Sequence, residues 1–190
     1  AEFGAEMVGI DFSAAIDSAH LNLKGLPNVH LVQTDIYRLP FKEGVFDFVY
    51  SIGVLHHLPD PKKGFTALLP IVKDKGSVSI WVYSKTRFIL NSLLEMVRWV
   101  TIRLPLRMTK WLSLLMASID WCLFIAPYRY GKKIPLLSRM AEYIARLSPR
   151  TKEYSECPFF VCYTDWFDRL SAPIRFYYGE EELRDWAVST

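Results

Sequence analysis

The first 84 residues contain four short apolar runs, and helix-like stretches or turns separate them. The runs are MVGID, VHLVQTD, VFDFVYSIGVL and SVSIWVYSK. Short apolar runs of this kind are typical of parallel strands that are buried on both faces of a sheet. Because right-handed crossovers connect such strands, we expect all four carboxyl ends on one edge. The sequence therefore predicts an α/β fold with a doubly wound, mostly parallel sheet.

Two of these runs end on an acidic residue, Asp11 and Asp35. Ligands of doubly wound folds bind outside the carboxyl ends of the strands. An acid there can accept hydrogen bonds from both ribose hydroxyls of an adenosine, and an acid one strand over can accept one from the adenine amino group. Alternatively, each aspartate only caps the loop that follows it. Since two of them close apolar strands about one βαβ unit apart, we predict a nucleoside site.

Longer stretches of the same region carry a family resemblance. The segments VGIDFS and VQTDIYRLPFKEGVFDFVYSIGVLHHLPDP resemble the class I S-adenosylmethionine-dependent methyltransferases, in particular the small-molecule and quinone-type group. The run LPFKEGVFDFVYS is the most specific part. The resemblance covers residues 1–84 and returns more weakly at DWFDRLSAPIRFYYGEEELRDW. It implies a Rossmann-like fold, S-adenosylmethionine as cofactor, and methyl transfer to a small or amphipathic acceptor.

The resemblance also implies roles for residues at the first two strand ends. Asp11 would bind the ribose diol, and Phe12 would pack beside the adenosine. Asp35 and Ile36 would hold the adenine. These four residues are the expected nucleoside half of the cofactor site.

The third strand would supply the rest of the site. By resemblance, the backbone carbonyls of Ser51, Ile52 and Gly53 would lie near the methionine part of the cofactor. His56 and His57 would face the acceptor. Methyl transfer needs a base only where the nucleophile carries a proton, and histidine suits that task near neutral pH. We expect His57, ahead of His56, to supply it, and the alternative is that one imidazole binds the loop backbone while the other is half exposed.

The family's glycine-rich turn is expected about 20 residues before Asp11. Only ten residues precede Asp11, and Gly4 is the single glycine before Gly9 of the strand itself. We therefore expect a chain that lacks the first strand of the sheet and the glycine-rich turn that follows that strand. The C-terminal stretch GEEELRDWAVST is predicted to be a helix, after which the last edge strands of the sheet would be missing.

The middle of the chain has a different character. Residues 85–156 contain long apolar, aromatic-rich stretches with helical punctuation, which predict a helical insertion between a partial core (1–84) and a return to the core (157–190). From Cys157 onward we expect short strands and loops before the final helix. The window 85–139 holds ten basic residues against two acidic ones, a net charge of +8, which leaves −5 for the rest of the +3 chain.

Three interpretations of the insertion stay open. It can be a structural cap on the sheet, or a lid that selects the acceptor, with Trp99, Trp111, Trp121 and Tyr128 as candidate lining. It can also dock on an anionic membrane surface through residues 85–139. The run from Trp111 to Tyr128 is short for a spanning helix and contains Asp120. Because the basic residues are interleaved with large aliphatic ones, a nucleic acid is not the expected partner.

The remaining composition limits the possible functions. The cysteines (Cys122, Cys157 and Cys162) form no metal-ligand pattern, so we expect no metal site and a reducing, cytoplasmic interior with buried thiols. The predicted function is S-adenosylmethionine-dependent methyl transfer to a small or lipid-like acceptor. The alternatives are a non-catalytic methyltransferase-like interaction module, a membrane-surface-associated protein, and a nucleotide-dependent oxidoreductase.

Overall fold

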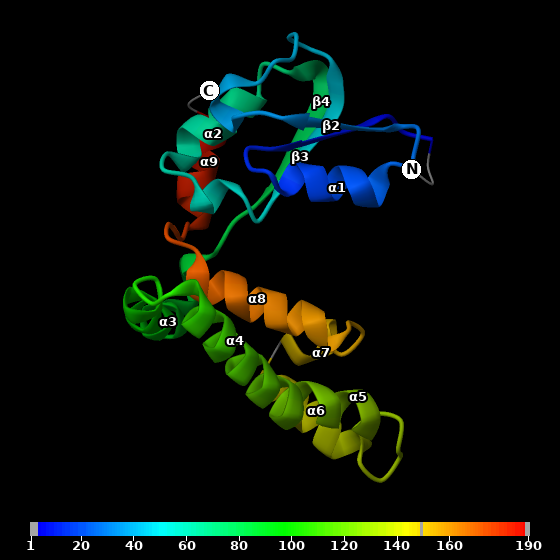
Figure 1. The fold of residues 1–190 in the computed structure, drawn as a ribbon, viewed down its shortest axis with the longest axis vertical. Helices are drawn as coiled ribbons and strands as arrows, with labels where there is room; N and C mark the ends of the chain where they lie inside the picture. The colour runs from blue at the N-terminus through cyan, green and yellow to red at the C-terminus, as the bar shows by residue number, and fades with distance from the viewer. Residues whose placement is uncertain (1–3, 149, 189–190) are drawn as a thin grey trace. The chain divides into compact units, whose positions relative to one another are not determined.

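The computed structural model describes residues 4–148 and 150–188 (Figure 1). The chain divides into two compact units. One comprises residues up to Thr86 together with those from Ile174 onward, and it is called the α/β unit below. The other, Arg87–Pro173, is called the helical unit. These units do not coincide with the predicted segments 85–156 and 157–190, because the chain enters the α/β unit again only at Ile174.

The α/β unit contains two pairs of parallel strands. Strand β1 (Met7–Asp11) pairs with β2 (Val29–Gln33), and β3 (Phe46–Ile52) pairs with β4 (Val72–Trp81). Among the described residues, these are two separate two-stranded sheets rather than the one continuous sheet that we expected. The parallel pairing and the intervening helices confirm the predicted α/β, Rossmann-like class.

In the described part of the chain, three α-helices, three short 3₁₀ turns and an isolated bridge accompany these strands. The α-helices are α1 (Ala15–Leu23), α2 (Pro61–Leu68) and α9 (Glu180–Val188). The short 3₁₀ turns are η1 (Ile36–Arg38), η2 (Leu55–His57) and η3 (Lys85–Arg87), and an isolated parallel bridge joins Ser84 to Tyr178. Helix α2 begins as its sequence predicts, with Asp60 accepting a hydrogen bond from the Lys63 amide (3.0 Å) and Pro61 in the first turn.

Two local features of this unit are irregular. Helix α1 begins at Ala15, and just before it the Ser13 hydroxyl donates to Asp11 (2.7 Å) and accepts from the Ala15 amide (3.2 Å). The segment KDKG lies within β4 as an irregularity in the ladder. Gly76 permits this path, since a Cβ there would lie 2.8 Å from the Asp47 carbonyl oxygen.

The core of the α/β unit consists of large apolar side chains. Leu55, Phe65 and Trp186 are buried together, and Ile80 of β4 packs against them. Trp186 brings the C-terminal helix α9 to this core and contacts Phe65, with the two ring centres 5.9 Å apart. The core therefore fixes α2 and α9 against β4 and holds η2, which carries the two histidines.

The helical unit confirms the predicted helical middle. Its elements are α3 (Phe88–Thr101), α4 (Leu106–Asp120), the π-helical segment η4 (Trp121–Ile125), α5 (Ala126–Gly131), α6 (Ser138–Leu147), α7 (Arg150–Tyr154) and α8 (Phe159–Ser171). Helices α3 and α4 both pack against α8. The expected strand and loop character after Cys157 is not found, because α8 occupies that segment.

Helical periodicity explains this difference. Cys162, Trp166 and Leu170 recur at intervals of four residues and lie on one side of α8. Pro158 precedes the helix, and Pro173 follows it, as is usual at helix boundaries. Residues that face inward every fourth position are typical of a helix, whereas a strand would alternate at every second position.

Candidate functional site

The two predicted nucleoside-binding acids lie at the ends of neighbouring strands. Asp11 is the last residue of β1 and is opposite Gln33, the last residue of β2. The Thr34 amide donates to the Asp11 carbonyl oxygen (3.0 Å), and Asp35 is the next residue. Strand pairing therefore brings Asp11 and Asp35 to the same edge of this sheet.

Each acid caps the loop that follows it. Asp11 Oδ1 accepts hydrogen bonds from the amide and the hydroxyl of Ser13, both at 2.7 Å. Asp35 Oδ1 accepts one from the Tyr37 amide at 2.9 Å. Within the described part of the chain, the second carboxylate oxygen of each has no hydrogen bond. Capping thus orients both carboxylates and leaves one acceptor oxygen on each.

The hydrophobic neighbours of the two acids differ in exposure. The Phe12 side chain is 75% exposed, so no described residue covers the ring beside Asp11. Ile36 is partly buried and packs against the core residues Leu55 and Phe65. This contact ties the loop after β2 to the segment that carries the histidines. A second link is the Tyr37 hydroxyl, which donates to the Asp60 carbonyl at 3.0 Å.

The carboxyl end of β3 carries the next three predicted residues. Ser51 is buried, and its hydroxyl has no hydrogen-bond partner among the described residues. Ile52 is exposed, as expected because successive residues of a strand face opposite sides and Ser51 is buried. Gly53 has φ = 75°, a conformation that other residues rarely adopt, and its amide donates to the Trp81 carbonyl (3.1 Å). This glycine turns the chain out of the sheet and into η2.

His56 is fully buried among aromatic rings. The ring centres of Tyr83, His57 and Trp81 lie 4.1, 4.2 and 5.9 Å from its own. Neither ring nitrogen of His56 has a hydrogen-bond partner within the described residues. Burial, followed by the nearby positive charges of His57 and Arg175, lowers the pKa of His56 from 6.5 to about 3. His56 is therefore neutral at physiological pH.

His57 is half-buried and hydrogen-bonded to the backbone. Its Nδ1 lies 2.6 Å from the Ile174 carbonyl oxygen, which can only accept, so Nδ1 carries the proton. In the neutral ring the lone pair then lies on Nε2. The Phe176 amide donates to the His56 carbonyl (2.9 Å), so the segment after Ile174 is bound to both histidine residues.

An aromatic cluster that was not among the predicted site residues lies beside the histidines. Trp81 and Tyr83 lie at and just beyond the end of β4, and Tyr177 contacts Tyr83 with the ring centres 5.9 Å apart. The Arg175 guanidinium lies over the Tyr83 ring, 4.7 Å from its centre. The alternation in WVYS and the cationic residue in IRFYY were the available signals. Together these groups form an aromatic, cationic surface around His56.

The three cysteines, all in the helical unit, differ in exposure. Cys122 is exposed, which differs from the expected burial, whereas Cys162 is buried and Cys157 is intermediate. Within residues 4–148 and 150–188, no group of three or more His, Cys, Asp or Glu side chains comes together in the manner of a metal site.

The N-terminal part of the chain is similar to a known protein family. Residues 1–80 match the family model described as a methyltransferase domain. This match confirms the resemblance to methyltransferases that the motifs after β2 and along β3 indicated.

Three curated proteins are similar to the chain over a comparable length. An uncharacterized protein of a Synechococcus species is 34% identical over 85 residues, which are 43% of this chain and 20% of that protein. Phosphoethanolamine N-methyltransferase 2 of Caenorhabditis elegans is 33% identical over 87 residues, 44% of this chain and 20% of that protein. Demethylmenaquinone methyltransferase of Clavibacter sepedonicus is 33% identical over 82 residues, 43% of this chain and 34% of that protein.

The chain thus spans between a fifth and about a third of the length of these relatives. Among solved structures, a putative methyltransferase of Bacillus halodurans matches with a TM-score of 0.42 and 20% identity, over 48% of this chain and 42% of that one. The PH0226 protein of Pyrococcus horikoshii also gives a TM-score of 0.42, at 26% identity, over 50% of this chain and 44% of that one.

Proposed function

We propose that the protein transfers a methyl group from S-adenosylmethionine to a small or amphipathic acceptor, because residues 1–80 match the methyltransferase-domain model. The observation that supports this proposal most is the pair of carboxylates on adjacent strand ends. Each has one oxygen held by its own loop and one oxygen without a hydrogen bond among the described residues. A nucleoside needs acceptors of this kind for its ribose hydroxyls and its adenine amino group.

The residues around the two acids suit the cofactor. Asp11 would accept from the ribose diol, and Asp35 from the adenine amino group. The exposed Phe12 ring offers an apolar surface to the adenosine, and Ile36 is held in place by the core behind it. The backbone carbonyls of Ser51, Ile52 and Gly53, where the chain turns out of β3, would lie near the polar methionine part. When bound, S-adenosylmethionine supplies an activated methyl group on a sulfonium.

The histidines have different proposed tasks. His57 holds its Nδ1 proton against the Ile174 carbonyl, so its Nε2 is the basic atom that would take a proton from an acidic acceptor. His56 is a poor base because its pKa is about 3. Its neutral, buried ring would instead hold the Tyr83 ring in position. His57 is thus the proposed catalytic base, and His56 is a positioning residue.

The aromatic, cationic surface around His56 indicates the chemical class of the methyl acceptor. The rings of Trp81 and Tyr83 can pack against an apolar or aromatic group, and the guanidinium of Arg175 favours an acceptor that carries negative charge. Two similar proteins are named for phosphoethanolamine and demethylmenaquinone, a phosphorylated amine and a lipid-like quinone. We therefore propose a small or lipid-like acceptor, and an anionic membrane surface as the partner of residues 85–139.

Calorimetric titration of the full-length natural protein with S-adenosylhomocysteine and with NADH tests this function. We expect binding of S-adenosylhomocysteine and none of NADH. Asp11→Ala should lower the affinity for S-adenosylhomocysteine by about 10- to 100-fold, the loss of hydrogen bonds to a charged acceptor. Asp17→Ala, which removes an exposed acid from α1, is the matched control and should change the affinity by less than about twofold.

Two results would overturn the proposal. Binding of NADH in place of S-adenosylhomocysteine would identify a nucleotide-dependent oxidoreductase. Absence of any affinity for S-adenosylhomocysteine would identify a non-catalytic module with a methyltransferase-like fold.

A further inference from the structure

The interior of the helical unit is made mainly of small and hydroxyl-bearing side chains. On α4, the residues that face α8 are Thr109, Ser113 and Ala117, at most 2% exposed and spaced four residues apart. The Thr101 hydroxyl donates to the Leu170 carbonyl (2.8 Å), which joins α3 to α8. Further buried residues of the unit have the same character: Ala141, Ala145, Thr151, Ser155 and Cys162. Small residues and hydroxyl hydrogen bonds at helix contacts are typical of bundles that meet lipid.

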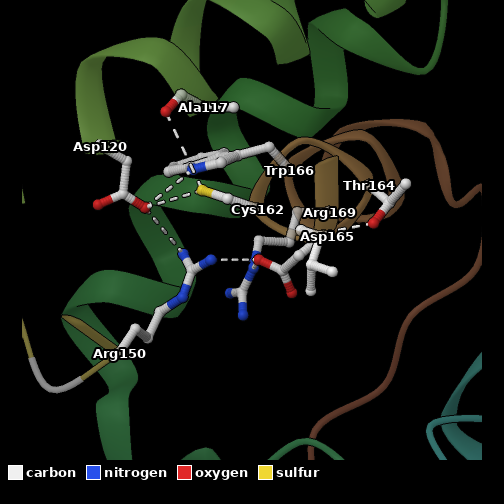
Figure 2. A network of polar contacts seen from close by, with 9 residues as sticks. Ala117, Asp120, Arg150, Cys162, Thr164, Asp165, Trp166 and Arg169 are labelled. Carbon is white, nitrogen blue, oxygen red and sulfur yellow. Dashed lines mark hydrogen bonds and ion pairs between the residues drawn. The ribbon is translucent and has the colours of Figure 1, made fainter. Parts of the chain in front are cut away.

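The same interior contains a network of charged side chains. Figure 2 shows the Asp120 carboxylate of α4 facing Arg150, Cys162 and Trp166. Asp120 Oδ2 lies 3.7 Å from an Arg150 nitrogen and accepts from the Trp166 indole (3.1 Å). Arg150 also pairs with Asp165, which in turn accepts from Arg169 (2.7 Å). Charges that face a bundle interior and pair with one another are likewise expected next to an apolar medium.

The outer faces of α3 and α4 are apolar. On α4 the face opposite α8 carries exposed large side chains, namely Met108, Trp111, Leu115 and Ile119. On α3 the corresponding residues are Ile89, Leu93, Met96, Trp99 and Val100. These two sets of residues are called the apolar faces below. A solvated helix normally carries charged residues on its outer face, but here they occur only in the first turns of α4.

Helix α4 continues without interruption into η4 and α5. The continuous helix spans Leu106–Gly131, is 26 residues long, and is apolar enough to cross a membrane by length and composition. This is longer than the Trp111–Tyr128 run that the sequence indicated. Asp120 lies within this helix, but its carboxylate is not left unpaired, because it contacts Arg150 and Trp166.

Helices α6 and α7 carry exposed charges. Helix α6 exposes Arg139, Glu142 and Arg146 beside the apolar Met140 and Tyr143, and Lys152 of α7 pairs with Glu142 (2.8 Å). These charges favour a unit that lies on a membrane over one that crosses it, because lipid on all sides would cover them.

Exposed basic residues accompany the apolar faces. Between Met96 and Ile119 the chain has four basic residues and no acidic one. Arg98 is buried and paired with Glu95, which leaves Arg103, Arg107 and Lys110 at the surface. None of these three forms an ion pair with a described residue. The Arg103 guanidinium stacks on Trp99, 4.3 Å from the ring centre, so charge and aromatic surface are adjacent.

We propose that the helical unit docks on an anionic lipid bilayer, with the apolar faces of α3 and α4 in the interfacial layer and α6 and α7 in water. Arg103, Arg107 and Lys110 would lie at the level of the headgroups, and Trp99 and Trp111 at the boundary with the acyl chains. This proposal rests on the membrane partner proposed above for residues 85–139 and names the side chains that would meet it. It does not require methyl transfer.

Co-sedimentation of the full chain with vesicles, without cofactor, tests this proposal independently of catalysis. The vesicles are made of phosphatidylcholine alone or with about one third phosphatidylserine or phosphatidylglycerol. We expect binding to the anionic vesicles that weakens with salt. Neutralising Arg103, Arg107 and Lys110 together with glutamine should lower the affinity about 100-fold, at roughly tenfold or less for each charge. Equal binding to neutral vesicles, or unchanged partitioning of the triple variant, would overturn the proposal.

A matched pair of variants tests the apolar faces. Met96→Glu/Trp111→Glu places two acids on them, and Met140→Glu/Tyr143→Glu places two acids at similarly exposed positions on α6. The first should lower vesicle affinity by about tenfold or more, and the second by less than about twofold. If the two pairs lose affinity equally, the assigned face is wrong. If the first pair instead converts a dimer to a monomer in light scattering, the face binds a second copy.

The depth of insertion is tested by tryptophan quenching. Variants that keep only Trp99 or only Trp111 are mixed with lipids brominated near the headgroup or near the acyl-chain end. Stronger quenching by the shallow bromines is expected for both. Stronger quenching of Trp111 by the deep bromines would show that the helix crosses the bilayer and would overturn the interfacial placement.

Discussion

The two compact units bury different mixtures of side chains. Large apolar residues are buried in both, Ile125 and Leu170 among them in the helical unit, but small and hydroxyl-bearing residues are buried mainly in the helical unit. The α/β unit buries Leu55, Phe65 and Trp186 together, as an ordinary water-soluble core does. The helical unit buries Thr109, Ser113 and Ala117 between its main helices, while Trp111 and Leu115 lie outside. Composition alone hides this contrast, because both units are rich in apolar residues. The difference teaches that the position of an apolar residue on its helix, and not its presence, indicates the medium that a unit contacts.

The largest expected effect is on the core of the α/β unit. Leu55→Ala removes a fully buried side chain and leaves a cavity beside Phe65 and Trp186. We expect the free energy of unfolding of this unit to fall by about 2–5 kcal/mol. Urea denaturation followed by near-ultraviolet circular dichroism measures it. Leu21→Ala, at an exposed position of α1, is the control. A loss as small as that of the control would show that the core is not packed as described.

The charged network should be the most sensitive part of the helical unit. Arg150→Met keeps much of the side-chain volume but leaves Asp120 and Asp165 without their shared partner. Because these carboxylates are largely buried, we expect the unfolding free energy to fall by about 2–3 kcal/mol, at or below the lower end of the cost for a fully buried pair. Amide exchange of α4 reports the loss. Arg146→Met, at an exposed position, is the control. An equal loss of stability there would show that the charged network does not stabilise the helical unit.

Enlarging a small interior residue of the helical unit should also lower its stability, through overpacking rather than through a cavity. Ala117→Leu inserts a large side chain where α4 meets α8, and we expect a loss of about 1–3 kcal/mol through overpacking. Leu115→Ala, two residues away on the outer face, should change stability in detergent-free buffer by less than about 0.5 kcal/mol. Thermal unfolding of both variants measures the difference. If Leu115→Ala is the more damaging change, α4 faces the opposite way.

The smallest predicted effect is the pH dependence caused by His56. Its pKa is about 3 in the folded chain and near 6.5 when unfolded, so the unfolded state binds more protons between these values. Stability should therefore fall as the pH is lowered from 7 to 5, by about 1–2 kcal/mol relative to His56→Gln. Urea titrations at several pH values measure this difference. The same substitution at exposed His20 is the control, and equal pH dependence of the two would contradict the assignment.

Much of the α/β unit could be predicted from the sequence, because its signals are local. Apolar runs that end at Asp11 and before Asp35 gave the strands, and Asp60 with Pro61 gave the start of α2. The capping hydrogen bonds of both aspartates also depend only on residues two positions away.

The parts that could not be predicted depend on contacts between distant segments. His56 is enclosed by Tyr83 and lies near Arg175, and the Asp120 network joins residues 30 to 46 positions apart in the sequence. No local pattern encodes such a partner. The two separate strand pairs could not be predicted for the same reason, because the pairing of strands depends on contacts between segments that are distant in the sequence.

Hydrogen–deuterium exchange of the full-length protein, with S-adenosylhomocysteine or with anionic vesicles, tests the division of tasks between the two units most directly. We expect S-adenosylhomocysteine to slow exchange in the loops after β1 and β2, around Ser13 and Tyr37, and to leave exchange in α3 and α4 unchanged. Vesicles should slow exchange in α3 and α4 and leave those two loops unchanged. Protection of the Ser13 and Tyr37 loops by vesicles, or of neither unit by its own ligand, would contradict this division of tasks.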